Sequence, residues 1–79
     1  MALTSDQRIE MAEMFRLMGD PTRLNILISC LDGPVSVGEL TKITGASQSL
    51  VSHHLRLLRA ARILRATRQG RHMFYTAAD

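Results

Sequence analysis

A single residue, Ala46, separates the signal that ends one helix from the signal that begins the next. Gly45 is the residue type found most often just past the end of a helix, and Ser47 is a preferred N-cap residue. Upstream, Ser36 opens a capping box, which marks the start of the earlier helix. Only a tight turn fits between the two helices. The sequence therefore predicts a helix-turn-helix over about residues 36–61.

Local signals mark the remaining elements as well. A first helix is predicted from about residue 4 to Met18, and a second begins at Asp20-Pro21, which combines an N-cap side chain with a proline at the first helical position. After residue 63, β-branched and aromatic residues surround Gln69-Gly70, and this pattern predicts a β-hairpin over about residues 63–76. The predicted core residues of the second and third helices are Leu24, Leu27, Ile28, Leu31, Val37, Leu40 and Ile43.

These elements predict one domain over residues 1–79. It is mainly α-helical, with four helices, a helix-turn-helix and a two-stranded β-hairpin; the family resemblance described below implies a winged helix-turn-helix. A chain of 79 residues is near the size at which one hydrophobic core is only marginally stabilising. The first helix carries more apolar residues than one buried face needs, namely Ile9, Met11, Ala12, Met14, Phe15, Leu17 and Met18. We therefore predict a homodimer formed through this helix; the alternative is that the rest of the chain wraps around it.

The charge distribution indicates an anionic partner. Residues 1–45 carry six acidic and four basic residues, whereas residues 46–79 carry six arginines and one acid, Asp79, which leaves this half at about +5. A membrane surface would attract the same charge, but no run approaches the roughly 20 apolar residues of a spanning helix. The N-terminus also lacks the basic and apolar regions of a signal peptide. We expect a cytoplasmic protein with no membrane partner.

The fourth predicted helix has one polar face. At about 100° per residue, one arc of roughly 120° contains Ser49, Ser52, His53, Arg56, Arg59 and Ala60. The other side contains Leu50, Val51, Leu55, Leu57, Leu58 and Ala61. A face that is merely solvated usually mixes acids with bases, yet no acid occurs between Glu39 and Asp79. Short polar side chains let a helix enter the DNA major groove and contact base edges, while arginines behind them reach phosphates.

The arginines at 56, 59, 62, 65, 68 and 71 recur every three residues but do not form one stripe. Arg56 and Arg59 share a helix face, whereas a spacing of three alternates faces on a strand, so Arg65 and Arg68 are predicted on opposite sides. The tip of the hairpin projects from the core, and Gly70 there permits positive φ. Arg68 with Arg71 is therefore the predicted basic cluster at the tip of the hairpin.

Four separated motifs resemble the ArsR/SmtB family of small dimeric winged-helix repressors of bacteria. They are Gly19-Asp20-Pro21-Thr22-Arg23-Leu24, Ser36-Val37-Gly38-Glu39-Leu40, Ser47-Gln48-Ser49 with Val51-Ser52-His53-His54-Leu55, and Arg68-Gln69-Gly70-Arg71 with Tyr75. The resemblance implies sequence-specific binding to a near-palindromic operator as a homodimer, and release by a metal ion or another inducer. It also implies two sets of DNA-binding residues. Gln48, Ser49, Ser52 and His53 face the major groove, and Arg68, Gln69, Gly70 and Arg71 form the wing.

The resemblance bears on the inducer too. Arsenic- and cadmium-type members carry cysteines at the positions of Ser36, Gly38 and Thr41, and these thiolate ligands are absent here. In zinc- and cobalt-type members, an Asp after the wing begins a C-terminal helix with further ligands. Asp79 stands at that position, which makes it the candidate ligand for zinc or another divalent transition metal; the alternative is a solvated terminal residue. We expect the chain to be truncated and to lack the family's C-terminal helix, rather than to be a minimal variant that dimerises through its first helix alone.

Two other functions are compatible with such a domain. A winged-helix module for protein contact predicts an apolar, acid-containing face on the fourth helix, and the absence of acids there argues against it. A thiol-based redox sensor would use Cys30, the single cysteine, although a buried small hydrophobe is the alternative for this residue. His54 is expected in the core or at an interface. No Ser-His-Asp or paired-carboxylate arrangement is indicated, so we do not expect an enzyme.

Overall fold

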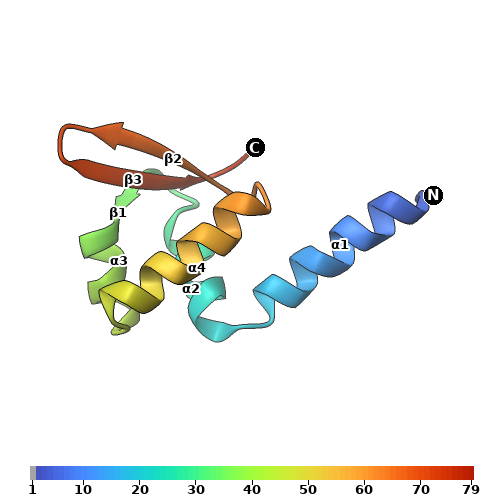
Figure 1. Cartoon of the computed structure of the whole chain (residues 1–79), viewed down its shortest axis with the longest axis horizontal. Helices are drawn as coiled ribbons and strands as arrows, with labels where there is room; N and C mark the ends of the chain where they lie inside the picture. Colours follow the sequence, from blue (N-terminus) through green and yellow to red (C-terminus); the bar gives the residue numbers. More distant parts are fainter. Residues whose placement is uncertain (1) are drawn as a thin grey trace.

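The structure is a computed structural model and describes residues 2–79. Within this range the chain forms the predicted winged helix-turn-helix (Figure 1). The helices are α1 (Ser5–Met18), α2 (Pro21–Ser29), α3 (Val37–Thr44) and α4 (Gln48–Ala60), and the strands are β1 (Val35–Ser36), β2 (Leu64–Gln69) and β3 (His72–Ala77).

Side-chain caps start all four of these helices. The hydroxyl of Thr4 accepts a hydrogen bond from the Gln7 N–H, and Asp20 caps α2 directly before its N-terminal proline. Ser36 and Glu39 form the predicted capping box of α3, in which the Glu39 N–H donates to the Ser36 Oγ at 3.2 Å. Ser47 caps α4 through its own side chain. The helix boundaries therefore follow from local chemistry.

The turn between α3 and α4 is as short as predicted. Gly45 has φ of 70°, in the left-handed region that favours glycine, and its N–H donates to the Thr41 carbonyl at 2.9 Å. Ala46 then leads directly to the Ser47 cap. Because this turn leaves almost no slack, α3 and α4 pack as one helix-turn-helix unit.

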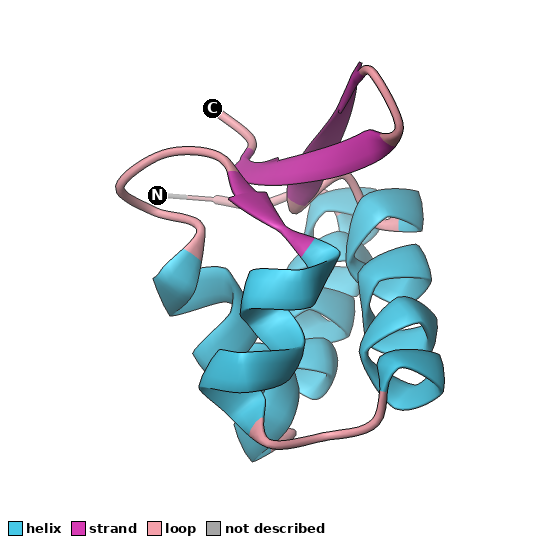
Figure 2. Ribbon diagram, turned by 90° about the vertical axis from the view of Figure 1, so that its left-hand side faces the viewer, coloured by secondary structure: helices cyan, strands magenta, loops and turns pink. Residues whose placement is uncertain are grey.

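The sheet has one strand more than the predicted wing. β2 and β3 pair antiparallel, with Gln69 opposite His72, so the tight turn is Gly70-Arg71, one residue later than expected. Gly70 has φ of 62°, which a glycine adopts without strain. The added strand, β1, pairs with β3 through Val35 opposite Tyr75. Figure 2 shows this three-stranded sheet across one end of the helices.

The core is contributed by every element except β1 and β3. Its buried members are Leu17, Ile26, Cys30, Leu40, Val51, Leu55, Leu58, Ile63 and Leu64. Part of the predicted core is wrong: Leu24 and Ile28 on α2 and Leu31 just after it are 41–62% exposed, and Ile43 on α3 is also exposed. Ile26 and Cys30 fill the core in their place, because the opposite side of α2 faces the other elements.

Helix α1 extends away from the other helices (Figure 1), and Leu17 is its only buried residue within the described part of the chain. The apolar side chains of Ile9, Met11, Met14 and Phe15 are exposed. The alternative in which the rest of the chain wraps around this helix is therefore wrong for residues 2–79. This apolar surface is therefore left uncovered by residues 2–79.

Candidate nucleic-acid interface

The apolar side of α4 is buried, and its polar side is largely exposed. Val51, Leu55 and Leu58 are at most 1% exposed and anchor the helix to the core. On the other side, Gln48, Ser49, Ser52 and Arg56 line one open surface depression, and His53 is exposed. The structure therefore brings these predicted site residues together along one helix. Leu50 departs from the predicted apolar side, since it is 43% exposed near the start of the helix.

The wing contributes residues beside the start of α4. Arg71, His72 and Met73 line a second groove together with Gln48 and with Ser36, Val37 and Gly38 at the start of α3. Gln48 thus belongs to both surfaces. Arg68 and Gln69 are exposed on β2, in register with Met73 and His72, and Arg68 is not among the residues that line the groove.

The turn after α4 sets the position of the wing. The Ile63 N–H donates to the Leu58 carbonyl at 2.9 Å, and the Arg62 N–H donates to the Arg59 carbonyl at 3.0 Å. These bonds resemble a Schellman motif, in which the residue past the helix end adopts a left-handed conformation. Arg62 has φ of 62°, the only positive φ of a non-glycine residue in the described chain. Only residues 61–63 separate α4 from β2, so the wing follows the helix through a short, hydrogen-bonded turn.

The groove shared by α3 and the wing is not predicted by the sequence. From the sequence, Ser36 is identified as a cap and, like Gly38, as the equivalent of a cysteine position, but neither residue is predicted to lie beside the wing. In the structure, these residues line the groove because β1, which ends at Ser36, pairs with β3, one of the two strands of the wing. His72 is also part of this groove. A two-residue strand leaves no periodic pattern, so the sequence holds no clear signal for this placement.

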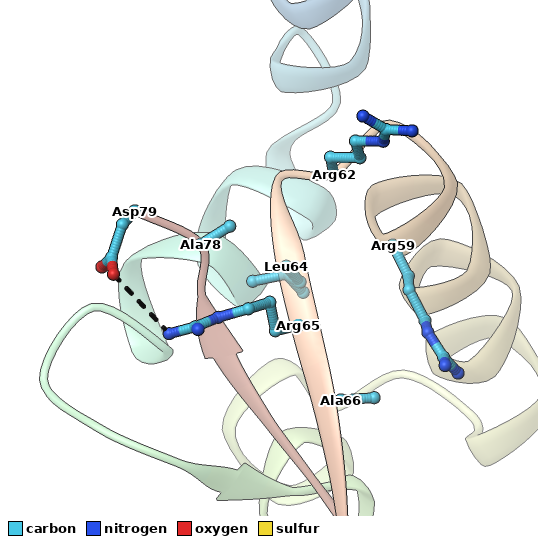
Figure 3. A pocket seen from close by; sticks show the side chains of 7 residues that line it. All are labelled: Arg59, Arg62, Leu64, Arg65, Ala66, Ala78 and Asp79. Atoms are coloured by element: carbon cyan, nitrogen blue, oxygen red, sulfur yellow. Dashed lines mark ion pairs between the residues drawn. The ribbon is translucent and has the colours of Figure 1, made fainter.

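Asp79 lies apart from both surfaces. It is almost fully exposed, and its carboxylate is 3.9 Å from the Arg65 guanidinium, an ion pair drawn in Figure 3. In the same view, Arg59 stands on α4 beyond β2 and Arg62 points away, so these three arginines do not converge. Within residues 2–79, no group of three or more His, Cys, Asp or Glu side chains is placed to hold a metal ion. Asp79 alone would supply one oxygen ligand, and the metal site stays a prediction.

Cys30 is fully buried against the core, at the C-terminus of α2. Burial raises the pKa of its thiol to about 11, because the surrounding apolar groups disfavour the thiolate. A redox-sensing cysteine needs both thiolate character and access to oxidant. The environment of Cys30 provides neither, which favours its interpretation as a core residue.

The helix-turn-helix and its attached wing define the chain as a winged helix-turn-helix protein with a polar recognition-type helix. The sequence profile described as "Bacterial regulatory protein, arsR family" matches residues 20–66. The chain therefore belongs to the ArsR family. This family consists of transcriptional regulators and not of enzymes.

Individual relatives agree with this assignment. The chain is 36% identical over 77 residues to a "Transcriptional repressor SmtB homolog" of Synechocystis sp., covering 98% of this chain and 58% of that protein. It is 41% identical over 73 residues to "HTH-type transcriptional regulator KmtR" of Mycobacterium tuberculosis, covering 92% and 56%. The chain thus spans less than two thirds of the length of these two relatives.

A solved structure of HlyU from Vibrio cholerae has the same fold. It superposes with a TM-score of 0.90 at 30% sequence identity, over 96% of this chain and 83% of that one. No helix within residues 2–79 is long and apolar enough to cross a membrane.

We predict that Cys30 is unreactive in the native protein. With a pKa of about 11, only about one thiol in a thousand is ionised at pH 8, and burial blocks access to that fraction. Iodoacetamide should therefore alkylate Cys30 at least a hundredfold more slowly in the folded protein than in denaturant, as followed by mass spectrometry. Equal rates in the two conditions would restore the redox-sensor hypothesis.

Proposed function

We propose that the protein is a sequence-specific DNA-binding transcriptional repressor that acts in the cytoplasm as a homodimer. The observation that carries this proposal is the exposed polar arc of α4, which lies beside an arginine-bearing wing in a stretch that has no acid between Glu39 and Asp79. Family membership supports it. Protein contact is disfavoured, because a docking helix would present apolar and acidic side chains on this face.

The two surfaces have different roles in this proposal. Gln48, Ser49, Ser52 and His53 contact base edges in the major groove, since their side chains are short and carry hydrogen-bond donors and acceptors. Arg56, further along the same arc, contacts a phosphate. The wing residues Arg68, Gln69, Gly70 and Arg71 contact the backbone or the minor groove, where arginine is favoured by the negative potential.

The dimer would form through α1. Its apolar residues Ile9, Met11, Met14 and Phe15 are 43–74% exposed in the single chain, and Met11, Met14, Phe15 and Met18 line one apolar depression. Exposed patches of this kind mark interaction sites. Two-fold symmetry then implies a near-palindromic operator with half-sites about one helical turn apart.

Release from DNA would follow the binding of an inducer. In a longer form of the protein, Asp79 would be one ligand of zinc or another divalent metal, completed by residues beyond it or on the second subunit. Carboxylate oxygen is an acceptable zinc ligand, and such a site needs further nitrogen or oxygen donors.

Replacing the base-reading residues should reduce specificity. For Ser52→Ala/His53→Ala, the ratio of affinities for a selected operator duplex and a random duplex should fall about tenfold to a hundredfold, because the side chains that contact base edges are removed. Fluorescence anisotropy at fixed salt measures both affinities. Asn25→Ala, at an exposed position on α2, should leave the ratio unchanged. A ratio that survives the double substitution would exclude α4 as the recognition helix.

Replacing the wing arginines should weaken binding to every sequence alike. Arg68→Gln/Arg71→Gln removes positive charge from the phosphate-facing wing, so the slope of log affinity against log salt concentration should become shallower by about 1 for each phosphate no longer neutralised. Arg8→Gln/Arg16→Gln removes the same charge from α1 and is the matched control, with an unchanged slope expected. If the wing variant keeps the wild-type slope, the wing does not contact DNA.

Replacing Phe15 should weaken the dimer. This side chain is 74% exposed, so Phe15→Ser leaves the monomer core intact while removing apolar area from the proposed interface. The dissociation constant of the dimer, measured by sedimentation equilibrium, should rise at least tenfold. Ile43→Ser removes an exposed apolar group from α3 and should have no effect. Dimers of equal strength in both variants would place the interface elsewhere.

A further inference from the structure

His54 is the one buried side chain of polar character in the described core, with 5% of its surface exposed. It follows Ser52 and His53 on α4 but points into the protein. Its Nδ1 lies 3.4 Å from a terminal nitrogen of the Arg23 guanidinium, which comes from α2. A buried polar group needs such a partner, and this one joins two elements that are 31 residues apart in sequence.

Arg23 is itself held at the corner between α1 and α2. Its Nε donates to the Leu17 carbonyl at the end of α1, at 2.7 Å, and its backbone N–H donates to the Asp20 carboxylate at 3.0 Å. Main chain and side chain of Arg23 are therefore both fixed in place. Through this residue, the end of α1, the start of α2 and the middle of α4 meet at one point.

The contact requires a neutral imidazole. Arginine is always a donor, so the Nδ1 of His54 must accept and the proton must reside on Nε2. Three charged or titratable groups face His54: Asp20 at the cap of α2, Arg23 on α2, and His53 on α4, whose ring centroid is 5.7 Å away. From α1, the Leu17 carbonyl accepts a hydrogen bond from the Arg23 Nε, and the Glu13 carboxylate interacts electrostatically with Arg23.

Burial is the main cause that lowers the pKa of His54, with Arg23 and His53 adding to it and Asp20 opposing it. The folded protein therefore disfavours the protonated form. Stability contributed by neutral His54 is present above its ordinary pKa of about 6.5 and is lost as pH falls through the lowered folded value. Protonation would place a second cation beside the Arg23 guanidinium.

We propose that Arg23 and His54 form a positioning contact that fixes the base-reading face of α4 relative to the α1–α2 corner, and that protonation of His54 releases it. The inference rests on the proposed DNA-binding function. His54 touches no DNA in this arrangement and acts through Ser52 and His53, which precede it on the same helix. Acidification below the ordinary range of histidine should thus reduce sequence discrimination.

A change in the protein's net charge acts in the opposite direction. Acidification makes any protein more cationic, and this increases affinity for any duplex. Total affinity therefore mixes two effects, whereas the ratio of affinities for selected and random duplexes isolates the positioning contact. The probe is a duplex selected from a random pool by the wild-type protein, compared with a random duplex of equal length.

For the wild-type protein, the specificity ratio should fall about tenfold between pH 7.5 and pH 5.5, consistent with the loss of a hydrogen bond to a charged group. His54→Asn keeps an acceptor oxygen near the position of Nδ1 and does not titrate. It should retain the wild-type ratio at pH 7.5 and lose the pH dependence. His54→Leu and Arg23→Met each break the hydrogen bond and should lower the ratio at pH 7.5 by a similar factor, with the double variant no worse than either.

Circular dichroism of each variant at both pH values separates unfolding from altered recognition. A wild-type ratio that does not change with pH would overturn the inference, and so would a His54→Asn variant that keeps the wild-type pH dependence. Failure of the wild-type protein to select any sequence would instead overturn the proposed function. The two failures are therefore distinguishable.

Discussion

The exposure of the polar arc of α4 depends on the burial of the opposite side of this helix. Val51, Leu55 and Leu58 are withdrawn from water almost completely, and each such side chain contributes about 1.5–3 kcal/mol to folding. Because side chains on a helix are fixed relative to one another, anchoring this stripe forces Ser49, Ser52 and Arg56 outward. The polar arc is thus presented by core packing, and no separate interaction is needed to expose it.

The position of the wing is also set by α4. The hydrogen bonds at the end of α4 turn the chain into β2, whose first residue, Leu64, is again core. Arg62 occupies the left-handed position, where an L-residue with a Cβ is strained by about 1–2 kcal/mol. The rest of the fold offsets this strain, since Leu58 and Ile63 are buried on either side of the turn. Hydrogen bonds and core packing at this turn therefore fix the wing relative to the helix in the structure.

Elements with strong local signals could be predicted from the sequence, and elements that depend on distant pairing could not. Gly45 and Ser47 define the helix-turn-helix without reference to the rest of the chain, and the arc of α4 follows from its spacing. The pairing of β1 with β3 joins Val35 to Tyr75 across most of the domain and has no local pattern. The α2 stripe shows a further limit: spacing identifies an apolar face, but Leu24 and Ile28 prove to be exposed. Periodicity alone does not distinguish a buried apolar face from an exposed one.

The corner between α1 and α2 connects the exposed apolar surface of α1 with helix α4. On one side, α1 presents the apolar residues proposed for the dimer; on the other, Arg23 contacts His54 within α4. The Arg23 side chain donates a hydrogen bond to the Leu17 carbonyl in the last turn of α1, so a displacement of α1 would move the guanidinium relative to α4. Packed cores respond to such displacements by changing between discrete arrangements rather than by deforming smoothly. In the proposed dimer, the contact between Arg23 and His54 would then affect both the separation of the two α4 helices and the orientation of each of them toward DNA.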